Sequence, residues 1–314
     1  MSRDQRREKH TNTTKPLGKT PGAKWEKQRI RDSLCGAAFL TPSVVGVTLF
    51  FVLPFLVVVY YSFIQSPISP DFVGLANYKS VLQNSSFRMA AKNSLHFSLW
   101  AVPRAVILSL GLALILECRI PMKSLFRTFF LSPMMVPVAS VVLIWQVVFH
   151  YKGTLNVFLS SFGISPVDWL NSSYSQWVII LLFLWKNLGY NMILFMAALN
   201  NLPKELLEVA DVEGASALHK FFNIKLRYLS PTVLFVTILS IINSFKVFRE
   251  VYLLAGSYPY EDLYMIQHFM NNTFSGNADY QKMATAAVLM AIFMVVLIAI
   301  LFKVEDLFGK DVEG

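Results

Sequence analysis

Six segments of mostly apolar residues dominate this chain of 314 residues. They lie at residues 44–63, 95–116, 131–149, 177–199, 232–254 and 283–302, and the first can be extended back to residue 34. An α-helix of about 20 residues crosses the ~30 Å hydrocarbon layer of a bilayer. Composition agrees, because 55% of the residues are hydrophobic and only 15% are charged, against about 25% charged residues in soluble domains. The sequence therefore predicts an all-α integral membrane protein with six transmembrane helices.

Positive charge is unevenly distributed along the chain. The formal net charge is +9, and ten Lys and Arg residues lie in residues 3–31, ahead of the first span. If this tail is cytoplasmic, six spans place both termini inside, and the inner segments carry nine further Lys and Arg residues against five in the outer segments. Such an excess is typical of cytoplasmic loops. We therefore expect a multi-pass protein with both termini cytoplasmic, whose basic residues face anionic membrane lipid rather than nucleic acid.

Two regions follow from these patterns. Residues 1–33 are polar and basic, contain too few apolar residues to bury a core, and are expected to be a disordered cytoplasmic tail. Residues 34–314 form the six-span domain. The two cysteines, Cys35 and Cys118, both map near the cytoplasmic face, so no disulfide framework is expected. The first apolar segment is too long for the core of a cleavable signal peptide and is expected to remain as a span.

A polar segment at residues 200–231 separates the fourth and fifth spans and predicts two short helices. Asn201 is expected to cap the first helix, and Pro203 suits its first turn because the missing N–H would be unpaired there. Gly214 can take the left-handed conformation that ends a helix, and Ser216 can cap the second helix.

This loop also carries a family resemblance. The residues concerned are Leu202, Pro203, Glu208, Ala210, Gly214, Ala215, Phe221, Ile224, Leu226 and Pro231. In this order they resemble the cytoplasmic "EAA" loop of permease subunits of binding-protein-dependent ABC importers, in which the loop docks on the ATPase subunit. Three positions depart from the usual pattern, since Val209, Glu213 and Arg227 stand where Ala, Asp and Pro are common. The likeness extends over residues 37–302, nearly the whole chain beyond the tail.

The resemblance implies a transport subunit of the bacterial cytoplasmic (inner) membrane, closest to the carbohydrate-uptake branch of these importers. It implies as partners a second homologous permease in a heterodimer, two ATP-binding subunits and an extracellular or periplasmic solute-binding protein. No cofactor is expected on this chain, because ATP would be bound by the partner ATPase subunit. Sequence leaves open whether the solute is a disaccharide, an oligosaccharide or a glycerophosphate ester.

Polar residues inside the fourth and fifth spans are the candidates for a solute pathway. They are Lys186, Asn187, Asn191, Asn243 and Ser244. Amide and hydroxyl groups beside aromatic rings suit a sugar, which needs hydrogen bonds to its hydroxyls and apolar contact with its ring faces. The alternative is that these side chains join neighbouring helices by hydrogen bonds.

Three charged residues in the spans need a further explanation. Lys246 and Glu250 are spaced i, i+4 and are expected to form a weak pair on one helix face. Arg104 lies near the middle of the second span, where an unpaired charge is costly. It is either a pathway residue or a structural group bonded to backbone carbonyls of a broken helix.

No arrangement for catalysis or metal binding is evident. The chain has no H-E-x-x-H, C-x-x-C or G-x-S-x-G pattern, and its one Gly-Lys-Thr, at residues 18–20, lacks the glycine of a phosphate-binding loop. A transporter of this kind would therefore use an ATPase on another chain. A secondary transporter or channel is the main alternative function, and a membrane-bound enzyme the third.

Overall fold

The computed structural model describes residues 21–118 and 121–309. Within them it contains six helical segments long and apolar enough to cross a membrane, which confirms the predicted number. They are Cys35–Ser62, Ser85–Glu117, Val138–Ser160, Ser175–Asn200, Ser230–Ala255 and Tyr280–Asp306. The chain divides into two compact units, Met1–Val57 and Val58–Gly314.

The first unit consists of the helical segment ahead of residue 58. It contains α1 (Pro21–Val47), a π-helical turn η1 (Thr48–Val52) and the start of α2 (Leu53–Ser62). The π turn directly precedes Pro54, whose missing N–H prevents a regular i to i−4 bond, so a local change of register is expected there. Residues 21–33 are helical, contrary to the disordered tail expected for 1–33. The good helix formers Ala23, Glu26 and Gln28 extend the helix of the span outward. Residues 1–20 lie outside the described residues.

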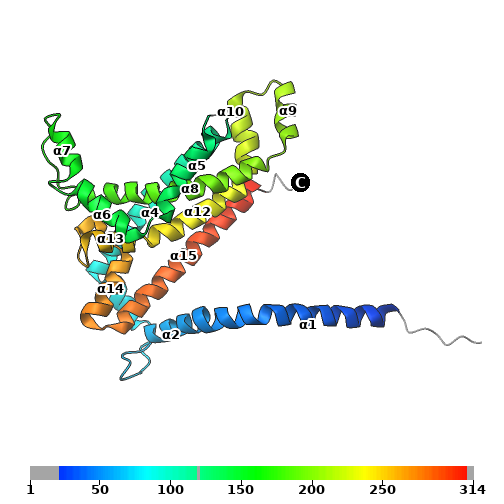
Figure 1. Cartoon of the computed structure of the whole chain (residues 1–314). Helices are drawn as coiled ribbons and strands as arrows, with labels where there is room; N and C mark the ends of the chain where they lie inside the picture. The colour runs from blue at the N-terminus through cyan, green and yellow to red at the C-terminus, as the bar shows by residue number, and fades with distance from the viewer. Residues whose placement is uncertain (1–20, 119–120, 310–314) are drawn as a thin grey trace, which may run out of the picture. The chain divides into compact units, whose positions relative to one another are not determined.

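The second unit holds the remaining helices (Figure 1). They are α3 (Ala76–Gln83), α4 (Ser85–Glu117), α5 (Lys123–Met135), α6 (Val138–Phe149), α7 (Thr154–Ser160), α8 (Ser175–Asn200), α9 (Lys204–Val212), α10 (Ala217–Lys220), the π-helical turn η2 (Phe221–Lys225), α11 (Leu226–Tyr228), α12 (Ser230–Phe245), α13 (Phe248–Ala255), the 3-10 turn η3 (Glu261–Leu263), α14 (Ile266–Asn277) and α15 (Tyr280–Gly309). α4 packs against α8 and α12, α5 packs against α8, and α15 packs against α12 and α14.

The contact between α4 and α8 is built on small residues. Ala101, Ala105, Ser109 and Ala113 follow one another at intervals of four and are all fully buried on one face of α4. Such a stripe lets two membrane helices approach closely, because no large side chain separates their backbones. Large apolar residues of α8, among them Phe195, complete this core.

α5 approaches α8 even more closely at Gly189. A Cβ atom built on Gly189 would lie 1.9 Å from the carbonyl oxygen of Phe130 and 2.4 Å from its carbonyl carbon. Only glycine therefore fits at this point of α8. The contact fixes α5 against the middle of α8.

Two of the predicted spans are broken near a polar cavity. α5 ends at Met135, Val136 is extended and α6 begins after Pro137, as expected because the residue before a proline avoids the helical conformation. The third span is therefore not one straight helix, and Pro133 stays inside α5. The fifth span was expected to be continuous, but α12 ends at Phe245 and α13 begins at Phe248, with two residues between them.

α14 carries a fully buried histidine, His268. Its ring centroid lies 4.7 Å from that of Phe248 and 5.7 Å from that of Tyr264. The backbone N–H of Met265 donates to its Nδ1 at 3.3 Å, and its buried Nε2 has no hydrogen-bond partner within the described part of the chain. Burial disfavours the charged imidazolium and lowers the pKa of His268 from 6.5 to about 4.

We expect this histidine to make the fold less stable in acid. An unfolded histidine binds its proton near pH 6.5, whereas folded His268 stays neutral down to about pH 4. The unfolded state therefore binds more protons in this window, and stability falls as pH is lowered through it, by about 3 kcal/mol at pH 4. The measurement is the thermal unfolding midpoint in detergent between pH 7.5 and pH 4. His268→Phe should flatten the profile, and His150→Gln, at an exposed position, should not; equal profiles for His268→Phe and the parent would contradict the prediction.

Candidate functional site: a polar cavity and a loop between two spans

A cavity of about 410 Å³ opens at the two helix breaks. α5, α8, α12 and α13 supply most of its walls. It is lined by Met134, Val136, Val138, Leu182, Phe183, Lys186, Asn187, Tyr190, Leu239, Asn243, Lys246, Val247, Arg249 and Glu250. Apolar and aromatic walls with a few polar groups are typical of small-molecule sites.

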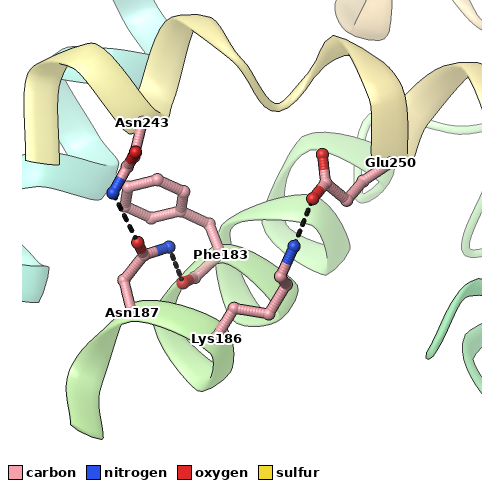
Figure 2. A network of polar contacts seen from close by, with 5 residues as sticks. All are labelled: Phe183, Lys186, Asn187, Asn243 and Glu250. Carbon is pink, nitrogen blue, oxygen red and sulfur yellow. Dashed lines mark hydrogen bonds and ion pairs between the residues drawn. The ribbon is translucent and has the colours of Figure 1, made fainter. Parts of the chain in front are cut away.

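An ion pair between Lys186 and Glu250 joins α8 to α13 on the wall of this cavity (Figure 2). The side chains are only 18% and 8% exposed, respectively. The pair corrects the expected pairing of Glu250 with Lys246. Because Lys246 lies in the turn between α12 and α13, the two residues do not share one continuous helix, and Lys246 remains exposed.

Two asparagines form a second link between α8 and α12 (Figure 2). Asn243 donates from Nδ2 to Oδ1 of Asn187 at 3.0 Å, and Asn187 donates from Nδ2 to the carbonyl oxygen of Phe183 at 2.8 Å. Both residues line the cavity. The structure thus brings together three of the five predicted pathway residues, namely Lys186, Asn187 and Asn243.

The other two predicted pathway residues lie outside the cavity lining. Asn191 is buried and donates to Oγ of Ser240 at 3.0 Å. Ser244 is buried and donates to Oγ of Ser98 at 2.9 Å. In this conformation both side chains join α12 to a neighbouring helix.

Arg104 is also placed away from the cavity. Its guanidinium donates to the carbonyl oxygen of Trp100 at 2.8 Å and lies 4.4 Å from the ring centroid of Trp100 and 5.2 Å from that of Trp177. A cation over aromatic faces is stabilised by the ring quadrupoles. The acceptor is a backbone carbonyl, as in the structural alternative, but α4 is one continuous helix and not a broken one.

The loop at residues 200–231 forms the second candidate site. It follows the C-terminal end of α8 (Figure 1). Gly214 has φ +76 and separates α9 from α10, and Ser216 caps α10 by accepting from the N–H of His219 at 3.3 Å. Both predictions are confirmed. The expected cap at Asn201 is wrong, because Asn201 ends α8 and Pro203 occupies the N-cap position of α9 without a side-chain hydrogen bond.

The loop presents an apolar surface that has no cover within the described residues. On α9, Leu206, Val209 and Val212 are exposed at intervals of three, and Val212 is 90% exposed. Leu218 and Phe222 of the second helix are exposed as well. We call these five residues the loop surface. A patch of this kind is typical of a site for another protein.

Three side-chain contacts join the loop internally and to the bundle. Lys220 pairs with Asp211 across the turn. Lys225 pairs with Glu117 at the end of α4 at 2.7 Å. The hydroxyl of Tyr228 donates to the carbonyl oxygen of Asn201 at 2.9 Å, next to the end of α8. The loop is thus attached to the ends of two spans.

The residues of the family pattern occupy different environments in the loop. Pro203, Glu208, Glu213, Gly214 and Pro231 are exposed, Ala215 and Phe221 are half-buried, and Ala210 is buried. Ala210 also accepts, through its carbonyl oxygen, the N–H of Ala215 at 2.9 Å, which closes the turn around Gly214.

Comparison with known proteins places this arrangement in a family. Residues 105–313 match the family described as "Binding-protein-dependent transport system inner membrane component". The chain belongs to this family. As an inner membrane component of such a transport system, it is a multi-pass permease subunit of a transporter rather than an enzyme.

Named members of the family are similar over most of the chain. An arabinooligosaccharides transport system permease protein of Bacillus subtilis is 33% identical over 69% of this chain and 70% of its own length. A trehalose/maltose transport system permease protein of Thermococcus litoralis is 32% identical over 74% and 81%. A crystal structure of a bacterial ABC transporter for import of the acidic polysaccharide alginate shares the fold, with a TM-score of 0.73, 20% identity and coverage of 90% of this chain and 98% of that one.

Several cavity residues of this family member were not among the predicted pathway residues. Lys246 and Glu250 were expected only to pair with each other, Arg249 is a further charged residue of the same apolar segment, and Met134 and Val136 come from a different span. The local signal for the first three was their charge inside an apolar segment. The contribution of α5 depends on the contact at Gly189, for which the sequence offers no pattern.

Proposed function

We propose that the chain is the transmembrane permease subunit of an ATP-driven ABC importer for a sugar or oligosaccharide. The observation that carries the proposal is the cavity at the helix breaks, where amide groups stand beside Phe183 and Tyr190. Amides can donate to and accept from hydroxyl groups, and aromatic rings cover the apolar faces of a pyranose. The two permease relatives, named for arabinooligosaccharides and for trehalose/maltose, support the same solute class.

The proposed assembly contains a second homologous permease in a heterodimer, two ATP-binding subunits and an extracellular or periplasmic solute-binding protein that delivers the solute. ATP is bound by the ATPase subunits, so this chain needs no cofactor. Both termini face the cytoplasm, which agrees with the distribution of Lys and Arg along the sequence. The loop surface then lies on the cytoplasmic side, where the ATPase subunits are.

The loop is the proposed coupling element. Docking of an ATPase subunit would cover Val212 and the other residues of the loop surface, which are exposed in the single chain. The contacts of Lys225 with Glu117 and of Tyr228 with the backbone at Asn201 attach the loop to α4 and α8. A displacement of the docked loop is therefore passed to two spans, and α8 carries part of the cavity wall.

The solute route is tested with Asn187→Ala and Asn243→Ala. In proteoliposomes containing the whole importer, we expect uptake of a labelled oligosaccharide to fall at least tenfold per folded transporter, because each variant removes hydrogen-bonding groups from the cavity. Asn191→Ala is the matched control, since Asn191 bonds Ser240 outside the cavity; it should lower stability but leave uptake per folded transporter unchanged. If all three variants reduce only the folded amount, the amides join helices and do not contact solute.

The coupling loop is tested with Gly214→Asp and Glu208→Lys. A residue other than glycine at φ +76 is strained by about 1 kcal/mol or more, which is enough to misplace α9 without unfolding the spans. The second change reverses an exposed charge on α9. We expect normal membrane insertion and normal capture of the binding protein, with weaker ATPase association or ATP hydrolysis uncoupled from uptake. Transport by both variants at the parent rate with normal coupling would remove the loop from the mechanism.

A further inference from the structure

The side chains that line the cavity carry more positive than negative charge. Lys186, Lys246, Arg249 and Glu250 are the charged residues that line it, three cations against one carboxylate. Glu250 is used by the ion pair with Lys186. None of the ion pairs within the described residues includes Lys246 or Arg249. The cavity therefore presents two cationic side chains that no ion pair within residues 21–118 and 121–309 neutralises.

The position of these two cations follows from the helix break. Lys246 lies in the turn after α12, and Arg249 lies in the first turn of α13. Both side chains are exposed, whereas Glu250, on the next position of α13, is buried against Lys186. Of the charged residues at the break, the acid is thus buried in the cavity wall and the two cations stay exposed on the cavity lining.

We infer that the solute of this transporter is anionic: a sugar or small oligosaccharide that carries a carboxylate, sulfonate or phosphate group. This inference rests on the proposed function of the cavity as the solute site, and it narrows the solute class. Asn187 and Asn243 contact hydroxyl groups, and Lys246 and Arg249 contact the anionic group. A guanidinium can bind a carboxylate or phosphate with two parallel hydrogen bonds, and a lysine adds a second point of charge.

The geometry distinguishes this role from attraction to the membrane surface. Lys79 and Arg88 are also exposed cations, on α3 and α4, and they are absent from the cavity lining. If any exposed cation of the protein attracted the solute, Lys79 and Arg88 would contribute to binding as much as the two cations of the cavity. Recognition of an anionic solute requires the pair at the cavity and leaves the other pair without effect.

The test measures binding to the full-length chain in nanodiscs of zwitterionic lipid, by saturation-transfer NMR. Two matched pairs of probes are used: digalacturonate with the corresponding neutral galactose disaccharide, and glycerol 3-phosphate with glycerol. We expect at least one anionic probe to bind about tenfold or more tightly than its neutral counterpart. The advantage should shrink when salt is raised from about 0.01 M to about 0.15 M, since the screening length falls from about 30 Å to about 8 Å.

Two double variants, which have the same net charge as each other, show which cations cause the tighter binding of the anionic probes. Lys246→Gln with Arg249→Gln should abolish the anionic advantage and change binding of the neutral probe less than twofold. Lys79→Gln with Arg88→Gln should retain the advantage. Equal or tighter binding of both neutral probes, or loss of the advantage in the second double variant, would overturn the inference while the cavity remains the solute site. Absence of binding by every probe would overturn the cavity as a solute site, and the inference with it.

Discussion

Replacement of Gly189 by alanine is expected to displace α5 from α8 and to lower both the yield and the stability of the folded protein. The new Cβ would stand 1.9 Å from the carbonyl oxygen of Phe130 and 3.0 Å from the backbone nitrogen of Leu131. These are backbone atoms of a helix, so no rotation of a side chain relieves the overlap, and α5 must move away from α8. Overpacking that shifts backbone costs about 1–3 kcal/mol or more. The separation would also open the wall that Met134 contributes to the cavity.

The measurement is the yield of monodisperse protein after extraction in detergent, followed by its thermal unfolding. Gly111→Ala is a matched control, because Gly111 also lies within a spanning helix and a Cβ there meets nothing within 4 Å. We expect that control to equal or slightly exceed the parent in stability, since alanine favours helix more than glycine does. A Gly189→Ala protein that matches Gly111→Ala in yield and melting would show that α5 does not contact α8 as described.

Replacement of Glu250 by glutamine is expected to lower stability by about 3–5 kcal/mol. The change leaves the largely buried ammonium group of Lys186 without its counter-charge, and removal of one partner from a buried pair costs about this much. In the same chain, the exposed pair Lys282–Asp279 has side chains 41% and 26% exposed. Asp279→Asn should therefore cost less than about 1 kcal/mol.

A double variant separates the lost attraction from the penalty of a lone buried charge. Lys186→Met together with Glu250→Met removes both charges and should recover most of the stability lost in Glu250→Gln, because a well-packed apolar pair often equals a buried ion pair. Thermal or SDS-induced unfolding of the purified variants provides the comparison. Glu250→Gln melting like the parent, or a double variant as unstable as the single one, would contradict the described pair.

Local patterns in the sequence were sufficient for the membrane architecture. The six apolar segments predicted the spans, and Ser216 with Gly214 predicted the two-helix loop, because capping and left-handed turns depend on neighbouring residues. The break before Pro137 also depends on neighbouring residues, because a proline restricts the residue ahead of it. The expected cap at Asn201 was wrong because α8 continues to Asn200, one residue beyond the apolar segment, and Asn201 is its C-cap.

Contacts between distant segments had no such local signal. The spacing of i, i+4 in the sequence favoured Lys246 as the partner of Glu250. In the structure the helix is broken after α12, and the partner is Lys186, 64 positions away in the sequence. Asn187 and Asn191 are spaced i, i+4 and were assigned one role. The structure separates them, because α8 leaves the open cavity within that turn and packs against Ser240 of α12. Helix crossings decide which of two equivalent residues stays accessible.

Asn200 and Lys186 lie on opposite sides of the Gly189 contact along α8, at unequal distances from it. With a rise of 1.5 Å per residue, Asn200 lies about 16 Å from Gly189 in one direction and Lys186 about 4.5 Å in the other. A rotation of α8 about this fulcrum moves the two points in opposite senses, in a ratio of nearly four to one. A displacement of about 4 Å at the loop end thus becomes about 1 Å at Lys186. That step is small against the size of a side chain, so the loop end can move by several ångströms while the core and the ion pair between Lys186 and Glu250 are disturbed only slightly.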